Sequence, residues 1–208
     1  MRRGAAADWQ AALALSLALA FWYLTFVLKP LNFWLSMSLA VTTLTGFAFA
    51  CGGVKIRRAE WTRRNFLLGA AAAAILYGIF WAGNAVSAML FSFAPPEITA
   101  IYGIRQEGSA LPIALVLLFV TSPGEEIFWR GFIQSWAGRR FGPAAGWVLA
   151  AGLYAAVHIV AGNFMLIMAA LVAGLFWGFL YWRSASLVPC IISHSLWTVA
   201  IFILWPVA

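Results

Sequence analysis

The chain has 208 residues and a formal net charge of +7, yet only 9% of its residues are charged while 64% are hydrophobic. An ordinary soluble domain carries roughly 25% charged residues, so this composition excludes a soluble enzyme, and the short connections between apolar segments leave no room for a separate soluble domain. The excess of cations is explained by membrane topology and attraction to anionic lipid, so we expect a lipid bilayer and not nucleic acid as the partner.

Several apolar segments are long enough to cross a bilayer, which takes about 20 residues of helix. They predict an all-α, polytopic transmembrane bundle that forms one membrane domain over residues 1–208. We expect seven helices, at residues 9–28, 33–52, 66–93, 111–138, 143–161, 164–182 and 186–206. The first also resembles a secretory signal, but its apolar run continues beyond the possible cleavage site at residues 18–20, so we interpret it as an uncleaved helix. In the fourth, Pro123 and Gly124 suggest a division into two half-helices.

The positions of lysine and arginine predict the orientation, because cytoplasmic connections retain these residues. Lys29 and Arg105 fall on one side of the predicted membrane, and Arg130 falls within it. The other side receives Arg2, Arg3, Lys55, Arg57, Arg58, Arg63, Arg64, Arg139, Arg140 and Arg183. We therefore expect a multi-pass protein of the bacterial inner (plasma) membrane, with its N-terminus inside and its C-terminus outside.

The stretch "TSPGEEIFWRGF", residues 121–132, places charged side chains inside the fourth apolar segment. A charge at the centre of a membrane helix costs roughly 2.5–3.5 kcal/mol, so such groups need partners or a function. Glu126 and Arg130 are four residues apart, which predicts an ion pair on one helix face. Glu125 points about 100° away and must face a different helix. Helix capping behind Ser122 is an alternative explanation for Glu125 alone.

Both histidines of the chain, His158 and His194, also fall inside predicted helices. Counting about 1.5 Å per residue from the expected cytoplasmic ends, Glu125 lies about 20 Å deep, His158 about 22 Å and His194 about 15 Å. Three helices therefore bring ionisable groups to similar depths, which predicts a functional site.

Three motifs in chain order carry a resemblance to a known family: "EEIFWR" at 125–130, "YAAVH" at 154–158 and "HSLWT" at 194–198. This set resembles the CPBP family of glutamic intramembrane proteases, which includes the CAAX prenyl proteases and bacteriocin-processing or immunity proteins. The resemblance covers residues 109–208, which we expect to form the catalytic core. It implies that Glu125 and His158 activate a water molecule and that His194 stabilises the oxyanion.

Four residues receive supporting roles: Glu126 and Arg130 from their i,i+4 spacing, and Tyr154 and Thr198 from their places in the motifs of the resemblance. Two of these depart from the family pattern: Tyr154 stands where phenylalanine is usual, and Thr198 where asparagine is frequent. A threonine hydroxyl supplies a single donor, and loss of an oxyanion donor costs about 2.7–4 kcal/mol of barrier stabilisation. Asn84 is one candidate for a substitute donor.

The predicted function is therefore an intramembrane endopeptidase that uses neither a cofactor nor a metal and cleaves a membrane-associated, lipidated or C-terminally anchored protein precursor. Alternatives remain open. Two histidines and a glutamate could hold a catalytic zinc ion. The chain could be a catalytically weak scaffold or immunity protein of the same fold. Buried charges also occur in proton-coupled transporters, although the sequence lacks the repeated halves typical of them.

Overall fold

A computed structural model describes residues 7–51, 54 and 56–207 of the chain. Arg2, Arg3 and Lys55, which contributed to the predicted orientation, lie outside the described residues. Within the described part, every regular element is a helix. The elements are α1 (Asp8–Tyr23), η1 (Leu24–Leu28), α2 (Phe33–Ala50), η2 (Arg58–Glu60), α3 (Arg63–Leu90), α4 (Ala94–Gly103), η3 (Ile104–Glu107), α5 (Ala110–Val116), η4 (Leu117–Thr121), α6 (Ser122–Glu126), η5 (Ile127–Gln134), α7 (Ser135–Phe141), α8 (Pro143–Val157), η6 (His158–Ala161), α9 (Phe164–Ser184), α10 (Val188–Val199) and η7 (Ala200–Leu204).

These elements join into longer continuous helices that match the seven predicted segments. In the described residues, six runs have the length and apolar character to cross a membrane, and Val188–Leu204 is a shorter apolar helix. The predicted fold class, a polytopic helical bundle, is confirmed, and the chain is a multi-pass membrane protein.

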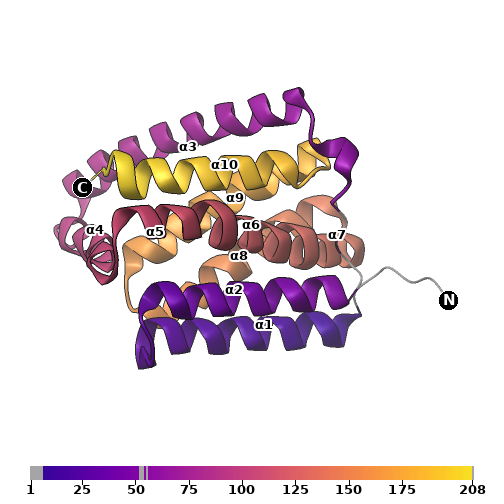
Figure 1. Ribbon diagram of the computed structural model, residues 1–208, viewed down its shortest axis with the longest axis horizontal. Helices are drawn as coiled ribbons and strands as arrows, with labels where there is room; N and C mark the ends of the chain where they lie inside the picture. The colour runs from indigo at the N-terminus through magenta and orange to yellow at the C-terminus, as the bar shows by residue number, and fades with distance from the viewer. Residues whose placement is uncertain (1–6, 52–53, 55, 208) are drawn as a thin grey trace.

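The bundle places the fourth predicted segment in its middle. In Figure 1, α1 and α2 lie side by side along one edge, α3 and α10 lie along the opposite edge, and the run from α5 to α7 passes between them. α8 and α9 pack against each other and against that central run. A helix in this position is surrounded by protein, which is where charged groups in a membrane protein are tolerated.

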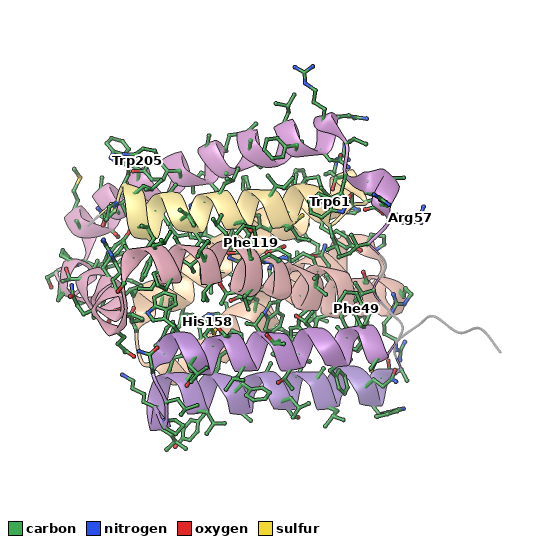
Figure 2. The ribbon with its side chains drawn as sticks, viewed as in Figure 1. Phe49, Arg57, Trp61, Phe119, His158 and Trp205 are labelled. Atoms are coloured by element: carbon green, nitrogen blue, oxygen red, sulfur yellow. The ribbon has the colours of Figure 1, made fainter. Side chains whose placement is uncertain are left out.

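The two ends of the bundle differ in the side chains they carry. Figure 2 shows Arg57 and Trp61 at one end and Trp205 at the other. α1 begins at the end that carries Arg57, and η7 finishes at the end that carries Trp205, as an odd number of crossings requires. Which end faces the cytoplasm stays a prediction from the distribution of cations.

The helical segment formed by α4 and η3 was not predicted. α4 begins with "APPE" and is followed directly by η3, so residues 94–107 form a short helical segment where a plain connection was expected. Pro95 and Pro96 suit the first turn of a helix, where the missing N–H groups have no intrahelical partner. At only 10 residues, α4 is too short to be recognised as a membrane crossing.

The suggested division of the fourth segment at Pro123 and Gly124 is wrong, because the chain is helical without interruption from Ala110 to Phe141. The π-helical turn η4 precedes Pro123, and there the Ser122 N–H donates to the Leu117 carbonyl oxygen, five residues back. In this register Pro123, which has no N–H, would have bonded Leu118. The Leu118 carbonyl oxygen instead accepts a hydrogen bond from Ser195 Oγ of α10 at 3.0 Å. A neighbouring helix thus replaces the bond that proline removes.

Gly124 allows two helices to pack closely and does not interrupt the helix that contains it. A Cβ atom at this position would overlap the Val41 side chain of α2 and lie 2.9 Å from Thr45 Oγ1. The Thr45 hydroxyl also donates to the Gly124 carbonyl oxygen at 3.3 Å. The absent side chain lets α2 approach the backbone of α6, next to the two glutamates.

Candidate active site

The structure brings the predicted catalytic residues of three helices to one cavity. The cavity has a volume of about 180 Å³, and its wall includes Glu125 from α6, His158 from the start of η6, and His194 and Thr198 from α10. π-helical turns stand on both sides of α6, and such turns often occur at functional sites. The convergence expected from helix depth is therefore present.

Glu125 is 7% exposed, and its two carboxylate oxygens have different surroundings. The Tyr154 hydroxyl of α8 donates to Oε2 at 2.6 Å, so Tyr154 fixes the carboxylate from a different helix. Within the described part of the chain, Oε1 has no hydrogen-bond partner, while the residue lines the cavity. One oxygen of Glu125 is thus free to contact a molecule in the cavity.

Glu126 is fully buried and forms the centre of a charged cluster. Its Oε1 accepts from Arg130 Nη1 at 3.0 Å, which is the ion pair predicted from the i,i+4 spacing. The same oxygen contacts Nδ1 of His194 at 2.8 Å, a contact the sequence did not indicate. Glu126 therefore connects Arg130 on its own helix to His194 on α10, and the two adjacent glutamates face different partners.

Arg130 is enclosed on both faces of its guanidinium group. The Tyr154 and Trp177 rings lie 5.1 and 5.4 Å from its central carbon, within the range of cation–π attraction. Its Nη2 donates to the Gly174 carbonyl oxygen of α9 at 3.3 Å. Arg130 thus ties the central helix to α8 and α9, and its charge is matched by Glu126.

Both ring nitrogens of His158 have protein partners. Nδ1 lies 2.8 Å from the Tyr154 carbonyl oxygen, which can only accept, so Nδ1 carries the proton. Nε2 accepts from the indole N–H of Trp22 at 3.1 Å. Trp22 lies on α1 and is fully buried. No sequence signal separated it from the other eleven of the chain's 12 tryptophans.

His194 is held between an aromatic ring and a carboxylate. Trp177 stacks on the imidazole with ring centroids 3.8 Å apart, and Glu126 contacts Nδ1. The Thr198 hydroxyl donates to the His194 carbonyl oxygen at 2.8 Å, so its single proton is used within the helix. Ser122 Oγ lies 3.5 Å from Thr198 Oγ1 and lines the same cavity. Ser122 therefore brings a hydroxyl to this site.

Asn84, considered as a substitute donor, lies elsewhere. It lines a second cavity between α3, α4, α9 and α10 and is not in the wall that holds Glu125. Its side-chain amide donates to the Val207 carbonyl oxygen near the end of the chain. The suggestion that Asn84 replaces the oxyanion donor is wrong for this structure.

The described residues do not provide a suitable set of ligands for the zinc alternative. Among the residues that the structure describes, no three His, Cys, Asp or Glu side chains form a group that could hold a metal ion. His158 has no nitrogen available as a ligand, because its partners are Trp22 and the Tyr154 carbonyl oxygen. The side chains of Glu126, Arg130 and His194 instead contact one another.

One of three comparisons with known proteins gave a match. Residues 107–200 match a family model described as "Type II CAAX prenyl endopeptidase Rce1-like". The match includes all three motifs and all seven residues assigned to the site. The searches of curated proteins and of solved structures gave no match. Residues 107–200 are therefore similar to the Rce1-like family of CAAX proteases.

Proposed function

We propose that the chain is a glutamic intramembrane endopeptidase that hydrolyses a peptide bond in a membrane-associated protein precursor. The match of residues 107–200 to a family of CAAX-type endopeptidases supports the reaction class. The observation that carries the proposal is the Glu125 carboxylate, which is buried in a cavity wall, with one oxygen held by Tyr154 and the other without a hydrogen-bond partner among the described residues. A fixed, desolvated carboxylate is suited to act as a general base.

In this proposal, Glu125 Oε1 takes a proton from a water molecule in the cavity, and the resulting hydroxide attacks the carbonyl carbon of the scissile bond. The carbonyl oxygen becomes an oxyanion in a tetrahedral intermediate. When the C–N bond breaks, Glu125 returns the proton to the leaving nitrogen, so the carboxylate is regenerated. Glu125 acts first as base and then as acid.

In the proposed oxyanion role, His194 uses both ring nitrogens as donors: Nδ1 donates to the Glu126 carboxylate, and Nε2 donates to the oxyanion. A ring with a proton on each nitrogen is an imidazolium, and Glu126 is its neighbouring carboxylate. Glu125, Glu126, Arg130 and His194 would then contribute two negative and two positive charges. A balanced set of charges is the least costly arrangement within a membrane. We propose that this cluster stabilises the developing negative charge.

The second cavity suggests where the apolar part of a substrate lies. It has a volume of about 320 Å³ and, besides Asn84, is lined largely by apolar side chains. Ile101, Leu166 and Phe202 contribute to the walls of both cavities. A hydrocarbon chain or an apolar anchor in this cavity would place a nearby peptide bond beside Glu125. We therefore propose that the substrate is a lipidated or C-terminally anchored protein.

Filling the second cavity tests this proposal. Ala169 lines it, and Ala169→Trp is expected to raise KM for a lipidated precursor about 15-fold, because lost burial of two methylene groups costs about 1.6 kcal/mol. Ala82→Trp is the control, since Ala82 is exposed on α3 and lines neither cavity. Cleavage is measured in proteoliposomes with matched lipidated and lipid-free precursors. Equal cleavage of the two precursors by the unmodified enzyme would contradict the proposed substrate class.

A further inference from the structure

The bond between Trp22 and His158 has a consequence for the proposed water site. A neutral imidazole has one N–H and one nitrogen lone pair. The Nδ1 proton is donated to the Tyr154 carbonyl oxygen, so the lone pair is on Nε2. The Trp22 N–H occupies it at 3.1 Å. In this arrangement His158 cannot also accept a hydrogen bond from water at Nε2.

The Trp22 side chain is held in place by the packing around it. Its side chain is fully buried and packs edge-on against both His158 and Trp129, with ring centroids 5.6 and 6.4 Å apart. His158 lines the Glu125 cavity, but Trp22 does not. The Trp22–His158 bond therefore directs Nε2 toward α1 and away from the molecule that the cavity would hold.

We infer that Trp22 competes with the hydrolytic water for Nε2 of His158 and holds the histidine in a resting position. This inference rests on the proposed function and on the role that the family resemblance implies for His158, activation of that water together with Glu125. Release of the indole lets the imidazole turn, so that Nε2 can accept from a water molecule shared with Glu125. Trp22, which lies outside the matched residues 107–200, is then a positioning residue that acts through His158.

The segment after Trp22 offers a route by which a substrate could cause this release. α1 continues into the π-helical turn η1, and the chain then reaches Lys29, whose φ of 47° lies in the left-handed region. A lysine in that conformation is less stable than in a regular helix. Phe26 of η1 lines the cavity and lies 6.2 Å from the His158 ring, measured between centroids. Phe26 lies four residues after Trp22 on the same continuous helix, so a substrate that displaces Phe26 would act one turn away from Trp22.

Replacement of Trp22 by phenylalanine tests the competition, because it removes the N–H donor and keeps an aromatic ring. We expect Trp22→Phe to raise turnover about 2- to 10-fold, the range set by the net strength of one neutral hydrogen bond. Trp9→Phe is the matched control on the same helix, since Trp9 is 65% exposed, and its turnover should not change. Thermal unfolding of both variants shows whether each is folded. A folded Trp22→Phe protein with unchanged or lower turnover would overturn the inference.

A second measurement detects the Trp22–His158 hydrogen bond without relying on activity. The chain has two histidines, so labelling with ¹⁵N-histidine gives NMR signals from two rings only. We expect one ring in the Nδ1–H form, with its second nitrogen accepting a hydrogen bond. Trp22→Phe should change the ¹⁵N chemical shift of that second nitrogen and leave the signals of the other ring unchanged. His158→Ala identifies which ring it is. Absence of the shift would show that Trp22 does not bond His158.

The two measurements separate this inference from the proposed function. If His158→Ala retains full activity while Trp22→Phe changes the NMR signal, the Trp22–His158 hydrogen bond exists but His158 has no role in catalysis. The inferred competition between Trp22 and water is then overturned. If His158→Ala is inactive and Trp22→Phe is less active than the unmodified enzyme, the proposed function stands, but the inference that Trp22 competes with water for His158 is contradicted.

Discussion

Replacement of Glu125 by glutamine is expected to lower the rate of peptide hydrolysis by about 100- to 10,000-fold, the range that general acid–base catalysis contributes. Glutamine has nearly the same shape, and its side-chain oxygen can still accept the Tyr154 hydroxyl that now bonds Oε2. It cannot take a proton from water at neutral pH. The variant should therefore fold normally, and the loss should appear in kcat and not in KM.

The measurement is initial cleavage rate in proteoliposomes, with thermal unfolding as the check on folding. Asp8→Asn is the matched control, because it makes the same chemical change at a carboxylate whose side chain is 68% exposed. Its rate should equal that of the unmodified enzyme. A folded Glu125→Gln enzyme that keeps more than a tenth of the rate would show that another group is the base. Inhibition by a chelator, reversed by zinc, would instead support the metal-dependent alternative.

Replacement of Arg130 by alanine is expected to reduce the free energy of unfolding by about 3–5 kcal/mol, the cost of leaving a buried charge without its partner. Glu126 is fully buried, and its Oε2 has no hydrogen-bond partner among the described residues, so Oε1 carries its contacts to Arg130 and His194. The variant also loses the guanidinium group between Tyr154 and Trp177. Folded yield and activity should both fall.

Equilibrium unfolding in detergent measures the change in stability, and Arg140→Ala serves as the comparison. Arg140 is on the same continuous helix, but its side chain is 60% exposed, and its 3.6 Å contact is with the exposed Asp8. An exposed ion pair contributes about 0–1 kcal/mol, so Arg140→Ala should be nearly neutral. An Arg130→Ala protein as stable and active as the unmodified enzyme would contradict the assignment of Arg130 to structural support.

Most of the fold was predictable because apolar segments of membrane length are a strong signal. The errors came from local features that depend on neighbouring helices. Pro123 predicted a break, but its missing N–H is compensated by the π-helical register and by the Ser195 hydroxyl, which lies on a helix distant in sequence but adjacent in space. Gly124 reinforced the same error, although its role is to admit Val41 and Thr45 of α2. Neither contact can be read from the sequence near Pro123.

The site was predictable in its composition but not in its hydrogen bonds. Sequence spacing predicted the Glu126–Arg130 pair, and helix depth predicted that Glu125 and both histidines would converge. The contact between His194 and Glu126 depends on how α10 is rotated against α6, which hydropathy does not determine. Trp22 and Trp177 were missed because an apolar helix in lipid carries many aromatic residues that only pack. Their contacts with His158 and His194 appear once the helices are assembled.

The central claim is that Glu125 makes this membrane protein a peptide hydrolase. The most direct test is to sequence the protein termini in membranes from cells that produce the unmodified enzyme or Glu125→Gln at equal levels. We predict new termini in one or more membrane-associated proteins with the unmodified enzyme, and their absence with Glu125→Gln. Identical sets of termini in the two membranes, with both proteins folded, would contradict the claim and favour a catalytically silent scaffold of the same fold.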